Sequence, residues 1–245
     1  MLITAAAAGA GRVTARLFHA SGARVVACDT DGAGLASLGA EYPGLTTIEA
    51  DAADEGDVAM VAAAAGAVDV LVNNVGIAGP TAAAEAIALA DWNEVLRVNL
   101  TSHFLFARAV IPGMKSRGSG LIVNVSSSSA RTGLPLRLPY AVSKGAVLCL
   151  TQTLARELGP HGIRVNAILP GAIRGARITR VIAAKADALG IPAAEYEAAL
   201  LRHVSMRCLV EPEDIAATIL FLAGPGGQRI TGQMLGVDGN IEWEE

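Results

Sequence analysis

Short runs of β-branched and aliphatic residues alternate with longer helix-forming stretches along the whole chain. This alternation is typical of parallel strands joined by right-handed helical crossovers. It therefore predicts an α/β fold in which a doubly wound parallel sheet of about seven strands carries helices on both faces. No repeat or linker divides the sequence, so we expect one domain over residues 1–245. The strands are expected near 2–4, 24–28, 46–49, 68–72, 120–126, 163–168 and 234–237, and the helices near 11–21, 54–65, 91–115, 139–158 and 212–223.

The composition fits buried parallel strands and argues against several classes of partner. Hydrophobic residues make up 52% of the chain but aromatic residues only 4%, so the core must be built from Ala, Val, Ile and Leu. The net charge of −4, without a block of like charges, gives no footprint for nucleic acid or an anionic membrane. No uninterrupted apolar stretch is long enough for a membrane span, and the first residues lack the basic start of a secretion signal. Small molecules are the expected partners.

The cysteines and histidines predict neither a disulfide nor a metal site. Cys28, Cys149 and Cys208 are odd in number and far apart, and the four histidines form no ligand pair. Such a chain fits a reducing compartment, so we expect a cytoplasmic protein.

The segment after the sixth expected strand is longer than an ordinary connection. Residues 172–210 contain helix-like stretches of their own. Because they follow the carboxyl end of a strand, where lids commonly sit, we predict a lid over the substrate site.

A glycine-containing turn follows the first expected strand and precedes the first expected helix. In this turn Gly9, Ala10 and Gly11 would let a pyrophosphate approach the backbone and the helix N-terminus. Asp29 ends the second expected strand 18 residues after Gly11, close to the spacing at which a carboxylate bonds an adenosine ribose. An Asp there would repel a 2′-phosphate, so the sequence favours NAD over NADP. The plainer interpretation is a common Ala/Gly turn beside a solvated carboxylate.

Three residues further along the chain suggest acid/base chemistry. Tyr140 and Lys144 are four residues apart in an expected helix, so both side chains should project from one face. A tyrosine with its usual pKa of about 10 is a poor base at neutral pH, whereas a neighbouring cation favours its phenolate. Ser127 closes a buried strand, where its hydroxyl can bond a substrate oxygen. An isolated Tyr-x-x-x-Lys more often marks a solvated helix face, so this interpretation depends on the other motifs.

Together these motifs resemble the classical short-chain dehydrogenase/reductase family, and the similarity runs from Ile3 to about Gly239. The family's Thr-Gly-x-x-x-Gly-x-Gly turn matches residues 4–11, and its Asn-Asn-x-Gly segment matches residues 73–76. Its active-site Asn, catalytic Ser, Tyr-x-x-x-Lys pair and Pro-Gly turn match Asn99, Ser127, Tyr140, Lys144, Pro170 and Gly171. The resemblance implies a Rossmann-like fold, oxidoreductase activity and a homotetramer.

The resemblance also implies a role for each matched residue. Ser127 would hold the substrate oxygen, Tyr140 would take the hydroxyl proton as hydride passes to the nicotinamide, and Lys144 would bind the nicotinamide ribose. Asn99 would hold a water between Lys144 and solvent. Asp51 and Ala52 would contact the adenine, Asn73 would support the central strand beside the cofactor, and Ile173 would lie against the nicotinamide amide. The cofactor-binding set expected in this way is Gly9, Ala10, Gly11, Asp29, Asp51, Ala52, Asn73, Tyr140, Lys144, Pro170, Gly171 and Ile173.

Two departures from the family pattern concern the cofactor. Ala5 replaces the first glycine of the turn and adds a methyl group where a positive φ is wanted. Gly175 stands where a Thr that bonds the carboxamide commonly follows the Pro-Gly turn. Both changes are expected to affect how the cofactor is held.

The residues expected near the substrate include several arginines. Guanidinium groups there could clamp a carboxylate or phosphate, although they could equally face water or a neighbouring subunit. The expected substrate contacts are Ser129 and Leu134 on one wall, together with Arg131 and Arg137, and Arg174 and Arg177 on the lid.

The sequence leaves three functions open. The first is an NAD-dependent oxidoreductase that interconverts a secondary alcohol and a ketone. The second is a 3-oxoacyl-thioester reductase, which NADPH preference would favour. The third is a dinucleotide-sensing regulatory protein without turnover, which would not need the intact set Asn99, Ser127, Tyr140 and Lys144. A lyase or dehalogenase is less favoured, because Lys144 and Asp29 would have no role in it.

Overall fold

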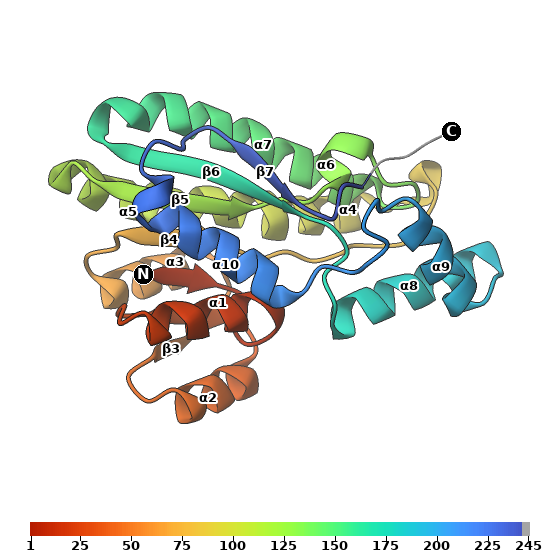
Figure 1. Cartoon of the computed structure of the whole chain (residues 1–245), viewed down its shortest axis with the longest axis horizontal. Coiled ribbons are helices and arrows are strands. Elements are labelled where there is room, and N and C mark those ends of the chain that lie inside the picture. The colour runs from red at the N-terminus through yellow and green to blue at the C-terminus, as the bar shows by residue number, and fades with distance from the viewer. Residues whose placement is uncertain (242–245) are drawn as a thin grey trace.

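A computed structural model describes residues 1–241 and contains a seven-stranded sheet in the order β3-β2-β1-β4-β5-β6-β7, with every neighbouring pair parallel (Figure 1). The predicted fold class is therefore confirmed. The strands are β1 Leu2–Thr4, β2 Val26–Asp29, β3 Thr46–Glu49, β4 Val70–Asn73, β5 Gly120–Val125, β6 Ile163–Pro170 and β7 Met234–Val237.

Helices cover both faces of the sheet, and each face has its own apolar core. One core joins the sheet to α1, α2 and α10, and the other joins it to α3, α5 and α7. Fully buried aliphatic residues fill both cores, as the low aromatic content requires. The helices are α1 Gly9–Ala20, α2 Gly32–Glu41, α3 Glu55–Ala65, α4 Leu89–Leu96, α5 Ser102–Arg117, α6 Ser129–Thr132, α7 Leu138–Leu158, α8 Ala176–Leu189, α9 Ala193–Arg202 and α10 Pro212–Ala223. Short helical turns are η1 Ala84–Ala86, η2 Arg97–Thr101, η3 Gly159–His161 and η4 Pro225–Gly227.

The sheet reverses its winding direction between β1 and β4, which are neighbours although β2 and β3 separate them in sequence. In such sheets a crevice for ligands opens at the carboxyl ends of the strands on either side of this point. The helices α8 and α9 lie at this end of the molecule, on the right in Figure 1. The predicted 172–210 segment thus forms two helices at the carboxyl edge of the sheet.

The structure differs from the expected helices in two places. It contains α2, which the sequence analysis missed because three glycines weaken its helical signal. Asp31 caps this helix by accepting a hydrogen bond from Gly34 N, and Leu35 and Leu38 bury one face. The single helix expected over 91–115 is instead α4, a π-helical turn at η2, and α5.

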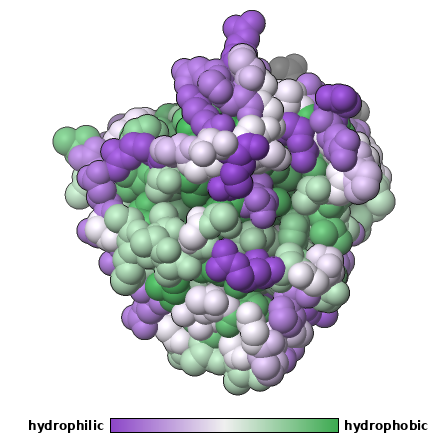
Figure 2. Space-filling view, turned by 90° about the vertical axis from the view of Figure 1, so that its left-hand side faces the viewer, coloured by the Kyte–Doolittle hydropathy of each residue, from purple (hydrophilic) through white to green (hydrophobic). Residues whose placement is uncertain are grey.

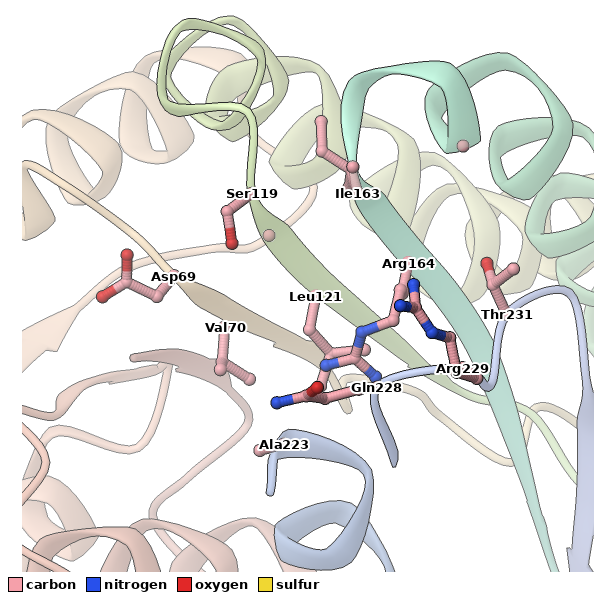
Figure 3. Close-up of a pocket in the computed structure, with 13 residues that line it drawn as sticks. Asp69, Val70, Ser119, Leu121, Ile163, Arg164, Ala223, Gln228, Arg229 and Thr231 are labelled. Atoms are coloured by element: carbon pink, nitrogen blue, oxygen red, sulfur yellow. The ribbon is translucent and has the colours of Figure 1, made fainter. Parts of the chain in front are cut away.

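The amino ends of the strands form the opposite edge of the sheet and carry a hollow of about 560 Å³. Asp69, Ser119 and Ile163 line it, at or next to the beginnings of β4, β5 and β6, together with Arg164 and Arg229 (Figure 3). Figure 2 faces this end of the molecule and shows hydrophilic groups set among apolar surface. None of the predicted catalytic residues lines this hollow.

Candidate active site

Tyr140 and Lys144 lie one turn apart on α7, as their spacing predicts. Pro139 occupies the first turn of this helix, where its missing N–H costs no hydrogen bond. Lys144 is 3% exposed, and its Nζ donates a hydrogen bond to Val125 O at 2.8 Å. Burial, and then the charge of Arg177, lower the pKa of Lys144 to about 7. The ammonium is therefore partly neutral near pH 7, which the sequence analysis did not foresee.

Ser127 follows β5 and is nearly buried. Its Oγ accepts hydrogen bonds from Ser129 N at 3.2 Å and from Ser129 Oγ at 2.9 Å. Because both contacts use the oxygen as an acceptor, the Ser127 O–H remains available as a donor. Ser129, predicted as a substrate contact, thus orients Ser127.

Asn99 lies in the π-helical turn η2 and joins two parts of the site. Its Oδ1 accepts a hydrogen bond from Ile77 N at 2.7 Å, and its Nδ2 donates to Ile77 O and Ser143 Oγ, both at 3.0 Å. Ser143 in turn donates to Tyr140 O at 2.7 Å. A π-helical turn within a longer helical run is often found at functional sites. Here it ties the loop after β4 to the helix that carries Tyr140.

A second set of buried polar groups supports the strands beneath the site. Asn73 Nδ2 donates to Asn124 Oδ1 at 2.9 Å, and Asn124 Nδ2 donates to Thr151 Oγ1 at 2.9 Å. Asn73 is 1% exposed and also donates to His103 O. It therefore braces β4, β5 and α5, as expected of a support, and its contact with the cofactor stays a prediction.

His103 is fully buried beside the loop after β4, and its Nε2 lies 3.3 Å from Val75 O. Its Nδ1 has no partner within residues 1–241. Burial, followed by the charge of Lys144, lowers the pKa of His103 to about 3. The imidazole is consequently neutral at physiological pH.

The turn between β1 and α1 is shaped as a close backbone cradle. A Cβ on Gly11 would stand 2.1 Å from Ala5 O and 2.6 Å from Asn74 Nδ2, so only glycine fits there. Ala8 gives α1 no side-chain cap, which leaves the first N–H groups of the helix without a side-chain acceptor. Gly9 has a φ of +55°. This geometry fits a pyrophosphate, because helix N-terminal N–H groups and the helix dipole favour an anion.

Ala5 adopts a φ of +52°, in the left-handed region that favours glycine. Its methyl group is therefore strained at the position where the family pattern has glycine. Asn74 Nδ2 holds this turn by donating to Thr4 O at 3.2 Å and Ala5 O at 3.0 Å. The turn thus has the shape of the cradle, but the backbone strain at Ala5 raises its free energy.

Asp29 lies at the end of β2 and faces the cradle. Its Oδ2 accepts a hydrogen bond from Ala7 N at 2.9 Å, and its Oδ1 accepts from Asp31 N at 3.1 Å. These contacts fix the carboxylate beside the turn. Neither Ala8 nor Thr30 adds a cation.

Asp51 and Ala52 lie after β3, on the same side as Asp29 along the sheet edge. Asp51 pairs with Arg97 at 2.9 Å and accepts from Ala53 N at 2.9 Å. Ala52 is buried. Asp51 is thus held in place by Arg97, a residue that the sequence analysis did not single out.

The entry to the lid is built closely around Gly171. A Cβ on Gly171 would stand 2.9 Å from the backbone of Asp238, while Gly171 N donates to Val237 O. Ile173 pairs with Val210 at the base of the lid. Gly175, before α8, has a φ of +143°, so the threonine common in the family would be strained in this conformation.

The arginines predicted near the substrate separate into two groups. Arg174 is exposed and pairs with Glu211 at 2.7 Å, while Arg131 donates to Met234 O at 2.6 Å. Neither of these contacts involves Ser127, Tyr140 or Lys144, so a clamp of four arginines stays a prediction. Arg177 places its guanidinium carbon 5.9 Å from the ring centroid of Tyr140, and Arg137 is buried nearby. Leu134 is half-buried on the α6–α7 connection.

Sequence reasoning missed Ser143, Lys185 and Tyr196. Ser143 lies one residue before Lys144, and its only signal was its place in the Tyr-Ala-Val-Ser-Lys segment. Lys185 is 5% exposed on α8, and its Nζ lies 5.8 Å from the ring centroid of Tyr196 on α9. A lone lysine in a lid has no sequence signal of burial, because lysine is usually exposed.

Within residues 1–241, no helix has the length and apolar character needed to cross a bilayer. In the same part of the chain, no three His, Cys, Asp or Glu side chains are grouped so that they could hold a metal ion.

Known proteins share both the sequence pattern and the fold. A family model described as Enoyl-(Acyl carrier protein) reductase matches residues 5–240. The 3-oxoacyl-(acyl-carrier-protein) reductase of Thermotoga maritima is 36% identical over 249 residues, covering 98% of this chain and 96% of the relative. A structure of actinorhodin polyketide ketoreductase with NADPH has a TM-score of 0.93 at 31% identity, covering 97% of this chain and 95% of that chain. A structure of NAD⁺-bound xylitol dehydrogenase has a TM-score of 0.92 at 28% identity. The match covers 98% of this chain and 97% of that chain.

Proposed function

Because the chain belongs to the short-chain dehydrogenase/reductase family, we propose that it is an NAD-dependent oxidoreductase that interconverts a secondary alcohol and a ketone. A bound nicotinamide dinucleotide would supply the hydride chemistry. Gly9, Ala10 and Gly11 would hold its pyrophosphate, with Asp51, Ala52, Pro170, Gly171 and Ile173 along the remaining wall. The cradle that a Cβ on Gly11 would fill is the feature that fits this group.

The observation that carries the proposal is that Lys144 Nζ bonds Val125 O at the end of β5, two residues before Ser127 and one helical turn from Tyr140. Ser127 has an O–H to donate to the substrate oxygen, since its Oγ already accepts two hydrogen bonds. Tyr140 is the acid/base that exchanges the proton of that oxygen. Lys144 lies one turn after Tyr140 and is held by its hydrogen bond to Val125 O. The protonated form of Lys144 stabilises the phenolate of Tyr140 electrostatically. Asn99 holds helix α7 and the loop after β4 together through its hydrogen bonds with Ser143 and Ile77.

The preference for NAD rests on Asp29. Its carboxylate is fixed beside the cradle by Ala7 N and Asp31 N. In that place the carboxylate would accept hydrogen bonds from the ribose hydroxyls and would repel a 2′-phosphate. With NAD as its cofactor, the enzyme would work mainly as an oxidant of alcohols in the cytoplasm.

We further propose a homotetramer whose interfaces include α4, α5 and α7. Phe106 on α5 and Val147 and Leu148 on α7 are buried within this chain. Phe104 remains 46% exposed on α5, and Val142 39% exposed on α7. Sedimentation velocity measures the assembly directly.

The experiment is a panel of sugars, hydroxy acids, cyclic alcohols and hydroxyacyl thioesters, assayed with NAD⁺ and with NADP⁺ at the same concentrations. We expect NADH formation from at least one secondary alcohol and a kcat/KM for NAD⁺ well above that for NADP⁺. Asp29→Ser should narrow the difference between the two cofactors. Absence of turnover across the panel in both directions, with intact dinucleotide binding, would instead favour the sensing protein.

A second candidate is a 3-oxoacyl-thioester reductase, which the 36% identity to the Thermotoga maritima enzyme favours. In that case acetoacetyl thioesters would be reduced with NADPH faster than any alcohol is oxidised with NAD⁺. The same panel distinguishes the two, because it measures both cofactors with both substrate classes.

A further inference from the structure

The lid carries a buried cation that the chain does not neutralise. Lys185 belongs to the buried face of α8, together with Ile182 and Ala186. Within residues 1–241 its Nζ has no hydrogen bond or ion pair, and it contacts the face of the Tyr196 ring. Desolvation of an ammonium without an anion is costly even when it is partial, as at Lys185, and a cation–π contact offsets only part of that cost.

Arg137 is a second buried cation at the same place. It is 4% exposed, and its Nη1 donates to Ala78 O at 3.1 Å and Gly79 O at 2.8 Å. Its Nε is buried and has no hydrogen-bond partner in the described chain. An arginine with two carbonyl partners and a free Nε retains both its charge and a donor for a ligand.

Arg177 adds a third cation directly at the catalytic tyrosine. Its guanidinium lies over the Tyr140 ring, and its Nη1 donates to Gly76 O at 2.9 Å. Gly76 itself lies against Lys144, because a Cβ there would stand 3.1 Å from Lys144 Nζ. Arg177 therefore joins the lid to the floor of the active site.

Arg137 is close enough to Lys185 and to Arg177 for their charges to repel. Burial and then the charge of Arg137 lower the pKa of Lys185 to about 8. Burial and then the charge of Arg177 lower the pKa of Arg137 as well. No carboxylate among residues 1–241 forms an ion pair with any of them, whereas the neighbouring Arg174 has Glu211. Folding thus leaves an excess of positive charge that a bound anion would neutralise.

We propose that Arg137, Arg177 and Lys185 form a receptor for an anionic oxygen group of the substrate, either a carboxylate or a phosphate, held beside Tyr140. The proposal rests on the proposed function and specifies its substrate class: a secondary alcohol or ketone that carries such a group. Guanidinium forks and ammonium groups donate charge-assisted hydrogen bonds to both kinds of anion.

Matched substrate pairs test this receptor. The first pair is 3-hydroxybutanoate and 3-hydroxybutanamide, and the second is 2-hydroxypropyl phosphate and 1,2-propanediol. We expect kcat/KM for the anionic member of at least one pair to exceed that of the neutral member by about tenfold or more. The pair with the larger ratio identifies carboxylate or phosphate as the preferred group.

Lys185→Met and Arg177→Met should each lower the anionic-to-neutral ratio by about tenfold or more. Arg180→Met is the matched control, because Arg180 is an exposed arginine on the same helix, α8, and its ratio should equal that of the wild type. A wild-type ratio near one in both pairs, or ratios unchanged by Lys185→Met and Arg177→Met, would overturn the proposal.

Calorimetric titration with butanoate and propyl phosphate separates this proposal from the proposed function. Neither compound has a hydroxyl to oxidise, so their binding does not depend on turnover. We expect at least one of them to bind the wild type. Its affinity for Lys185→Met should be lower by about tenfold or more. Binding without turnover of any alcohol would reject the proposed function and keep the receptor. Turnover of alcohols without any anion binding would reject the receptor and keep the function.

Discussion

The floor of the active site and the lid above it treat buried polar groups in opposite ways. In the floor, Asn99, Asn124 and Thr151 are fully buried and hydrogen-bonded to other parts of the chain. Beside it, the Nε of Arg137 is buried without such a partner, and Lys185 on α8 has only the face of the Tyr196 ring against its ammonium within residues 1–241. Unpaired atoms also occur in the floor, at Asn73 Oδ1 and His103 Nδ1, but these groups are neutral. The floor therefore leaves neutral atoms unpaired, whereas Arg137 and Lys185 keep positive charge that the proposed anionic group would neutralise.

The largest expected effect comes from breaking the floor at Asn99. Asn99→Ala removes the hydrogen bonds to Ile77 N, Ile77 O and Ser143 Oγ and leaves these groups without partners. We expect a loss of about 2–4 kcal/mol in the free energy of unfolding, measured by urea denaturation. Asn93→Ala, at an exposed position on α4, is the control and should change stability by less than about 0.5 kcal/mol. Equal effects of the two changes would mean that the floor is not held by Asn99.

A smaller effect tests whether the floor must stay uncharged. Burial lowers the pKa of His103 from its ordinary value of about 6.5 to about 3, so the unfolded chain binds this proton at a higher pH than the folded chain does. Stability should therefore fall as pH drops from about 6.5 towards 3, by at most about 3 kcal/mol between pH 6.5 and 4. His103→Gln should flatten the unfolding free energy over this range, whereas exposed His161→Gln should not. An unchanged pH dependence in His103→Gln would contradict the account of a buried neutral imidazole.

The smallest effect concerns the cofactor turn, where the cost lies in the backbone and not in a buried charge. Ala5→Gly relieves the left-handed φ of +52° and places the family's glycine in the turn. We expect a gain of less than about 1 kcal/mol in stability, because glycine also loses more entropy on folding. Dinucleotide affinity, measured by calorimetry, should rise or stay equal. Weaker binding by Ala5→Gly would show that the methyl group contributes to the site.

The sequence predicted the parts of the molecule whose signals are local. Alternating apolar runs located the strands, and the spacing of Tyr140 and Lys144 placed both side chains one turn apart on α7. The turn around Gly11 could also be predicted, because close backbone approach demands glycine. Helix α2 was missed because its capping residue Asp31 and its buried Leu35 and Leu38 are separated by glycines.

Other features depend on contacts between distant segments, and no local pattern encodes them. The π-helical turn that orients Asn99 arises where α4 and α5 meet within one apparent helix. Likewise, Arg174 and Arg177 are equivalent in sequence, but only the fold gives Glu211 to the first and the Tyr140 ring to the second. The burial of Lys185 follows from how α8 and α9 pack over the site.

The most direct test of the central claim compares turnover and cofactor binding in Tyr140→Phe. The substitution removes the hydroxyl but keeps the ring beneath Arg177, so the lid contact should survive. If Tyr140 is the acid/base, kcat with the best alcohol of the panel should fall by about 10²-fold or more, while the Kd of NADH stays within a few-fold of the wild type. Near-normal turnover in Tyr140→Phe would contradict the account.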